Sequence, residues 1–389
     1  MKSFALSLKK DTFLIFSVGL YMFATLVWGN SDTRILYYTS AAFLAGIVIL
    51  LRIKSRKLFL RKYYIPFFTF LLVSLISAFW AQDASNTIEQ CLSITINFLF
   101  ASLVINTVEE RGQGSKYLAV ICAVGFFMSF YLLICEGLEG RLGGIIFGQR
   151  LGKNIGNENV LGYFGSLSSV IALYNIRYFK RIHYCFILPV TFFVVLATGS
   201  RMAILLLAVG LVGVFLINMT FRNALTMMAR IVLVLMLLII ILNIPAFQMV
   251  KARLLDLTDL IAGKEVSSRS LYYRRIMIER GLASFLHNPF KGVGLGNTGV
   301  LLYGYISKGY FYLHNNYVEL LASIGFFGFF AYYSVYYYGF RVLYYSEKCI
   351  GLERKLVILL MTLALVNDIS NVTYYRSISY MLLFLPFVF

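Results

Sequence analysis

The sequence has 389 residues, of which 60% are hydrophobic and only 13% are charged. A soluble domain of this length needs far more charge on its surface, so the composition excludes a water-soluble protein. The net charge is +18, but most lysines and arginines stand in short clusters between apolar runs, which argues against nucleic-acid binding. We therefore predict an all-α, polytopic integral membrane protein.

The apolar runs predict about twelve transmembrane helices, since a helix needs about 20 residues to cross a bilayer. They form a single transmembrane domain over residues 1–389. The first run is basic and then apolar without a cleavage site, so we expect it to be retained. The predicted helices cover residues 12–29, 35–51, 63–80, 90–108, 117–137, 159–176, 183–199, 202–220, 230–248, 313–340, 356–372 and 374–389.

The positions of the basic residues predict the orientation of these helices. If the helices simply alternate, the basic clusters within 2–10, 52–62, 177–181 and 341–355 all fall on one side. The opposite side includes loops such as 81–89, which has no lysine or arginine. Because basic loops mark the cytoplasmic side, both termini should be cytoplasmic.

Two segments that are predicted to lie on the outer side are basic, contrary to this rule. One is 138–158, and the other is the long hydrophilic loop 249–312, in which 270–286 reads as an amphipathic helix that ends before Pro289. Long loops can translocate regardless of charge. Basic residues held on the outer face nevertheless indicate an anionic ligand there. The glycines within 292–296 follow no predicted strand, so we predict a flexible turn rather than a phosphate-binding loop.

Several polar residues fall on the predicted outer face, and each also has a purely structural explanation. Arg201 could snorkel to headgroups, and the loop helix could simply bind anionic lipid. His314 and Asn157 could be helix caps, and Asp368 could be a buried structural partner. Because all of these residues fall on the same predicted side of the membrane, we expect them to form one functional site. The candidate residues are Arg201 in Thr198-Gly199-Ser200-Arg201, Arg269 and Arg274 in the loop helix, His314 and Asn315, Asn157, and Asp368.

The order and spacing of these motifs resemble the O-antigen polymerase and O-antigen ligase superfamily of bacterial envelope glycosyltransferases. The resemblance covers about 150–340, and the remainder agrees only in hydropathy. It rests on Thr198-Gly199-Ser200-Arg201, on Arg274 before Asn288-Pro289-Phe290-Lys291-Gly292-Val293-Gly294, on His314-Asn315-Asn316-Tyr317, on Gly325-Phe326-Phe327-Gly328 and, more weakly, on Gly156-Asn157-Glu158-Asn159.

The resemblance implies an enzyme of the bacterial cytoplasmic membrane that uses undecaprenyl-diphosphate-linked glycans on the outer face, with no metal or other cofactor. It implies that Arg201 and a loop arginine bind the pyrophosphate and that His314 activates the acceptor hydroxyl. Family loop helices usually carry an aromatic residue four positions after the arginine, which fits Arg269, whereas the spacing to Pro289 favours Arg274. The further substrate-binding residues it implies are Asn315, Asn157 and Asp368.

We predict the first of three functions and keep the other two as alternatives. The first is a polymerase that joins lipid-linked repeat units into O-antigen or a capsular polysaccharide, and the second is an O-antigen ligase that transfers the glycan to lipid A–core. The third is a flippase, which should spread its charges over both halves of the chain rather than gather them on one face. The expected partners are the lipid-linked donor and acceptor, membrane lipid, a chain-length regulator and a flippase, but no nucleic acid.

Overall fold

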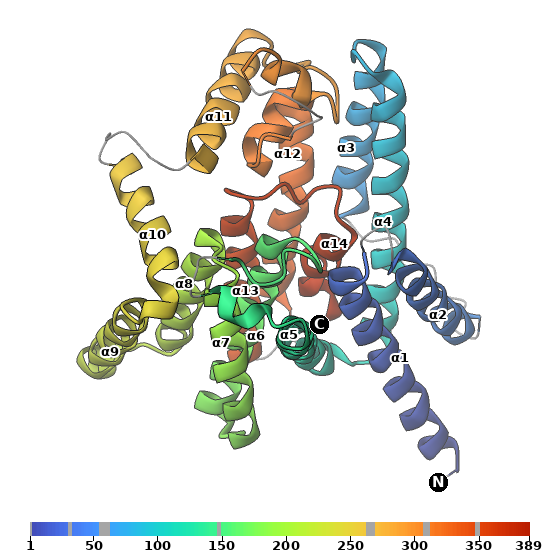
Figure 1. Ribbon diagram of the computed structural model, residues 1–389. Helices are drawn as coiled ribbons and strands as arrows, with labels where there is room; N and C mark the ends of the chain where they lie inside the picture. Colours follow the sequence, from blue (N-terminus) through green and yellow to red (C-terminus); the bar gives the residue numbers. More distant parts are fainter. Residues whose placement is uncertain are drawn as a thin grey trace.

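The computed structural model describes residues 2–29, 33–53, 63–145, 149–261, 269–305, 312–346 and 351–389. These residues form helices and no strand (Figure 1), which confirms the predicted all-α class. The helices are α1 (Lys2–Val27), α2 (Arg34–Arg52), α3 (Tyr64–Ile76), α4 (Ala84–Glu110), α5 (Gly114–Leu138), α6 (Glu158–Phe179), α7 (Ile187–Ala197), α8 (Arg201–Leu216), α9 (Ala224–Leu242), α10 (Gln248–Ile261), α11 (Arg269–His287), α12 (Asn316–Tyr345), α13 (Gly351–Asn367) and α14 (Ser377–Leu383).

Six of the described helices are long and apolar enough to cross a membrane, namely α1, α2, α4, α5, α9 and α12. Shorter apolar helices cover Tyr64–Phe79, Ile182–Ala197 and Arg201–Leu216. On α9 only Met227 and Leu242 are buried, so this helix exposes an almost continuous apolar surface, as a lipid-facing helix does. The helical pattern is therefore that of a membrane protein. The predicted number of about twelve spanning helices is not confirmed.

The prediction of a spanning helix over 374–389 is wrong. Only Ser377–Leu383 is α-helical there, and Leu385–Val388 forms a 3-10 turn. Seven residues cannot cross a bilayer. Residues 380–388 are all buried, and α14 packs against α4. The segment is apolar because it lies in the protein core, and hydropathy does not distinguish this from contact with lipid.

The α6 helix lies in the middle of the bundle and packs against α5, α7 and α8. Small residues permit this close packing, as is usual between membrane helices. A Cβ on Gly125 would lie 2.5 Å from the Ser168 Cβ, and one on Gly162 would lie 2.7 Å from the Ala203 Cβ. The Ser166 Oγ donates a hydrogen bond to the Ala203 carbonyl at 2.8 Å. The beginnings of α6 and α8 are thereby held side by side.

The long hydrophilic segment is more ordered than the sequence predicts. It contains the expected amphipathic helix, seen as α11, but also α10, which was not predicted and which packs against α8 and α9. In Figure 1, α11 lies beside α12 at the top of the view and α10 runs down the left side. Gly281 allows the close contact of α11 with the start of α12, because a Cβ there would lie 2.5 Å from side-chain carbons of both Leu313 and Val318.

The glycine-rich segment after α11 is bonded to α12 rather than forming the expected flexible turn. Gly325 interrupts the helical backbone of α12 with φ +68°, a conformation that glycine adopts readily. The amide of Phe326 then donates to the Pro289 carbonyl at 2.8 Å, and the Gly294 amide donates to the Ser323 carbonyl at 2.8 Å. The glycines thus serve backbone packing, in agreement with the rejection of a phosphate-binding loop.

Candidate active site

Four arginines from four different segments line one cavity of about 160 Å³. Arg150 precedes α6, Arg201 begins α8, Arg253 lies on α10 and Arg274 lies on α11. The structure therefore brings together Arg201 and Arg274, which the sequence placed in separate motifs. The remaining lining residues are Asn159, Gly199, Ser200, Met202, Ser270 and Ser370.

Two of the arginines are oriented by backbone carbonyls at the turn before α8, and a third by a backbone carbonyl of α10. The Arg150 Nε donates to the Thr198 carbonyl at 2.7 Å, and the Arg253 Nη1 donates to the Gly199 carbonyl at 3.2 Å. The Arg201 Nε donates to the Arg253 carbonyl at 2.6 Å. Gly199 has φ +60°, and a Cβ there would lie 3.1 Å from the Arg253 Nη1. The glycine therefore allows the guanidinium groups to converge.

Arg274 reaches the same cavity from α11 and makes different contacts. Its Nη1 donates to the hydroxyl and, at 3.5 Å, to the carbonyl of Ser370, in the segment after α13. Burial lowers the pKa of Arg274, and the positive charges of Arg201 and Arg150 lower it further. The same charges that oppose one another in the free protein would be stabilised by a bound anion.

The charges around the cavity do not balance. Glu158 pairs with Arg150 at 3.5 Å and Asp256 pairs with Arg201 at 3.3 Å. No acidic side chain in the described part of the chain pairs with Arg253 or Arg274. Among the described residues, four guanidinium groups thus meet two carboxylates around the cavity, and positive charge is in excess there.

The backbone adds to this positive field. Asn159 and Met202 line the cavity from the first turns of α6 and α8, so the positive ends of both helix dipoles adjoin it. Helix N-termini together with planar guanidinium groups suit the oxygens of a phosphate or diphosphate. The arrangement can therefore accommodate an anion of this class.

His314 lies next to this group, in the segment that precedes α12. Its φ is +53°, a left-handed conformation that is uncommon for a residue other than glycine, and its ring lies 4.4 Å from the Tyr312 ring between centroids. Burial lowers the pKa of His314 to about 4, and the charges of Arg274 and Arg376 contribute. The imidazole is therefore neutral at pH 7 and able to accept a proton.

Asn315 and Asp368 have structural contacts and do not line the arginine cavity. The Asn315 Oδ1 accepts the Val318 amide at 3.0 Å and so caps α12. Asp368 is buried, and its carboxylate accepts hydrogen bonds from Thr373 at 2.6 Å, Tyr333 at 3.0 Å and Asn316 at 3.1 Å. These bonds fix the 368–373 segment, which carries Ser370, against the start of α12. Their effect on the site is therefore positional.

Arg269 and Asn157 lie outside the arginine cavity as well. Arg269 is exposed at the start of α11, where its Nε donates to the Tyr273 hydroxyl at 2.8 Å and its guanidinium lies 5.3 Å from that ring. The aromatic residue four positions on thus packs with Arg269 locally, and Arg274 is the loop arginine that enters the cavity. Asn157 caps α6 by accepting the Asn159 amide at 3.0 Å.

Sequence reasoning did not name Arg150, Arg253, Asn159 or Ser370 as site residues. The sequence did give an indication of both arginines, because each lies in one of the two basic segments that are predicted to lie on the outer side. Nothing in the sequence marks Ser370, since only the fold brings the end of α13 to Arg274.

Comparison with known families adds to this geometry. Residues 185–333 match the family model of the O-antigen ligase. This match confirms the resemblance to the O-antigen polymerase and ligase superfamily. The matched residues include three of the four arginines that line the cavity, Arg201, Arg253 and Arg274, and also His314. No curated protein matches the chain.

Proposed function

We propose that this chain is a glycosyltransferase that joins lipid-diphosphate-linked repeat units into O-antigen or a capsular polysaccharide. The observation that carries the proposal is the cavity in which Arg150, Arg201, Arg253 and Arg274 converge beside neutral His314. The family match supports O-antigen polymerase or ligase activity in general. Undecaprenyl diphosphate is the proposed lipid carrier.

The proposed reaction uses a bond that is already activated. A hydroxyl oxygen of the acceptor glycan attacks the anomeric carbon of the donor, and the bond from that carbon to the diphosphate oxygen breaks. The lipid diphosphate leaves with the electron pair, stabilised by Arg201 and Arg274. His314 takes the proton of the attacking hydroxyl. Atoms and charges balance with no additional reactant.

Donor binding should also strengthen the base. In the free protein the pKa of His314 is held near 4 by burial and then by the charge of Arg274. A diphosphate on Arg274 offsets that charge, so the pKa of His314 should rise toward its ordinary value. A base whose pKa lies closer to the working pH is more effective. The site would then become fully competent only once the donor is bound.

An O-antigen ligase is the second candidate, because the matching family model carries that description. Both reactions use the same donor chemistry, and they differ in the acceptor. In the polymerase the acceptor is another lipid-linked repeat unit, and in the ligase it is lipid A–core. The arginine cavity and His314 serve either one.

A reconstitution experiment tests the proposal. Full-length protein in lipid nanodiscs, supplied only with undecaprenyl-diphosphate-linked repeat units, should form a ladder of products with two, three and more repeats. Addition of lipid A–core should leave the ladder unchanged. A glycosylated lipid A–core without a ladder would favour the ligase, and no product of either kind would contradict glycosyl transfer.

The proposed site should face the outside of the cytoplasmic membrane, as the basic loops predict. Ala283 is exposed on α11, and Thr220 is exposed between α8 and α9 on the predicted cytoplasmic side. With exposed Cys185 replaced by serine, Ala283→Cys should react with a membrane-impermeant maleimide in intact cells, and Thr220→Cys should react only after permeabilisation. The reverse pattern would show that the orientation is wrong.

A further inference from the structure

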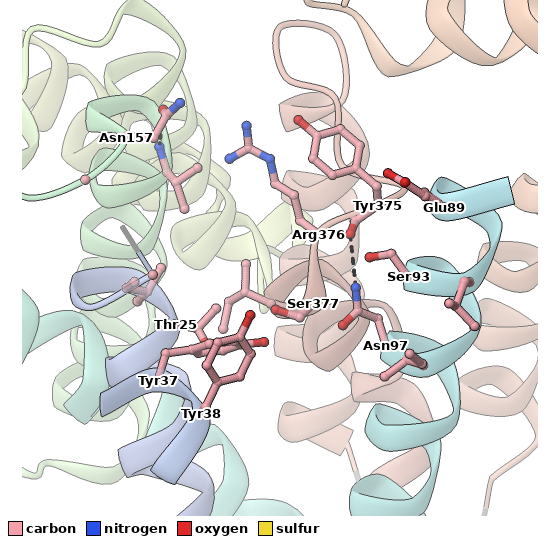
Figure 2. Close-up of a pocket in the computed structure, with 17 residues that line it drawn as sticks. Thr25, Tyr37, Tyr38, Glu89, Ser93, Asn97, Asn157, Tyr375, Arg376 and Ser377 are labelled. Atoms are coloured by element: carbon pink, nitrogen blue, oxygen red, sulfur yellow. Dashed lines mark hydrogen bonds between the residues drawn. The ribbon is translucent and has the colours of Figure 1, made fainter. Parts of the chain in front are cut away.

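A second and larger cavity, of about 680 Å³, lies among α1, α2, α4, the start of α6 and the segment that leads into α14 (Figure 2). Its volume is within the range of cavities that bind small ligands. Tyr37 and Tyr38 face it from α2, and Glu89, Ser93 and Asn97 face it from α4. Aromatic rings beside hydroxyl, amide and carboxylate groups suit a sugar, which has both apolar faces and many hydroxyls.

This cavity adjoins the arginine cavity at the start of α6 and is connected to His314 through aromatic rings. At the start of α6, Asn157 and Val160 line the larger cavity while Asn159 lines the arginine cavity. The second connection runs through aromatic rings. The Tyr312 ring lies 4.4 Å from the His314 ring and 6.4 Å from the ring of Tyr375, which lines the larger cavity. This chain of rings connects the larger cavity to His314, whose pKa is also lowered by the charge of Arg274 in the arginine cavity.

Arg376 is the one basic side chain among the described residues that line the larger cavity. Figure 2 shows its guanidinium pointing into the space between Asn157 and Tyr375. The Arg376 Nε is buried and makes no hydrogen bond with any described residue, and no acidic side chain in the described ranges pairs with the guanidinium. A buried donor without an acceptor is costly, so a ligand with an acceptor oxygen would stabilise this arrangement.

We propose that this cavity binds the acceptor glycan and that Arg376 pairs with an anionic group, a carboxylate or a phosphate, on one of its sugars. The proposal rests on the proposed function and names the substrate class of its second substrate. The acceptor hydroxyl would approach His314 from the larger cavity while the donor diphosphate lies on the four arginines. The two substrates would then meet at the base from opposite sides.

A binding experiment tests this site without requiring catalysis. The probe is the repeat-unit oligosaccharide released from the native polysaccharide, which has no diphosphate and can act only as an acceptor. Two further samples carry the same oligosaccharide with its carboxylates reduced to alcohols or with its phosphates removed. Binding is measured by calorimetry on the full-length protein in detergent, for the wild type, Arg376→Gln, Arg376→Lys and Arg222→Gln.

Arg376→Gln should weaken binding of the native oligosaccharide about tenfold or more, because it removes a charged hydrogen-bond donor. Arg376→Lys should weaken it less. Arg222, exposed between α8 and α9, is the matched control, and its glutamine variant should bind as the wild type does. One of the two treatments, removal of the carboxylates or of the phosphates, should weaken wild-type binding as much as Arg376→Gln does. That treatment identifies the anionic group.

Undecaprenyl diphosphate without glycan should bind equally to the wild type and to Arg376→Gln. Equal affinity of wild type and Arg376→Gln for the native oligosaccharide would overturn the proposal, as would equal wild-type affinity for all three oligosaccharide samples. If Arg376→Gln fails to fold, as judged by its melting temperature, Tyr38→Ala on the opposite wall should show the loss instead. A protein that binds in this way but transfers no sugar would retain this site and contradict the proposed function.

Discussion

Replacing Arg274 with alanine should abolish long polysaccharide in cells that depend on this chain, while the protein remains in the membrane at its normal level. Arg201→Ala should have the same result. Both guanidinium groups line the arginine cavity, although they come from α11 and α8. In the proposed reaction they stabilise the charge that develops on the leaving diphosphate.

The size of the effect follows from this role. Removal of one preorganised group that stabilises charge in a transition state costs about 10²–10³ in rate. A polymer of many repeats requires many successive transfers, so a loss of this size should eliminate long chains altogether. Lysine should rescue poorly at either position, because a point charge cannot form the two parallel hydrogen bonds of a guanidinium.

Arg269→Ala is the matched control for these two variants. It removes the same side chain from the same helix as Arg274, but Arg269 is exposed and contacts Tyr273 outside the cavity. Its polysaccharide should be close to wild type in length, measured on silver-stained gels with protein levels followed by immunoblot. Normal polymer in Arg274→Ala together with its loss in Arg269→Ala would show that the wrong arginine has been assigned.

The arginine site could be predicted from the sequence only where the residues lie in local motifs. Arg201 follows a turn between two apolar runs, and Arg274 stands at a fixed spacing from Pro289. Arg253 stands in no such motif, and its contact with Gly199 is a tertiary one. Local periodicity determines that a helix forms, but not which other segment it meets.

The fold, too, could be predicted only where a local pattern determines the structure. The amphipathic pattern predicted 270–286, and α11 spans Arg269–His287, because one face of that helix is buried against α12. The apolar pattern also predicted a spanning helix over 374–389, where the chain instead forms a short buried helix. In a membrane protein both lipid and protein core accept apolar residues, so hydropathy counts segments reliably only where one face stays exposed to lipid.

His314→Ala should leave donor binding intact and slow transfer by about 10²–10⁴-fold, which is the usual contribution of a general base. The arginines proposed to hold the diphosphate are unchanged in this variant, so the loss should fall on kcat rather than on donor affinity. His287→Ala is the control, since His287 is exposed at the end of α11. Single-turnover transfer with purified protein and saturating lipid-linked donor measures the effect. Transfer by His314→Ala at the wild-type rate would refute the assignment of His314 as the base.

The pH dependence of the wild type provides an independent check on the same residue. A proton on the imidazole removes its ability to accept another, so activity should fall as the pH falls through the pKa of His314. That pKa is about 4 in the free protein, because burial and the charges of Arg274 and Arg376 oppose the imidazolium. The acidic limb of kcat/KM should therefore lie near pH 4, whereas the limb of kcat, which reports the donor complex, should lie at higher pH because the bound diphosphate offsets the charge of Arg274. Identical acidic limbs for the two parameters would show that the diphosphate does not lie beside His314.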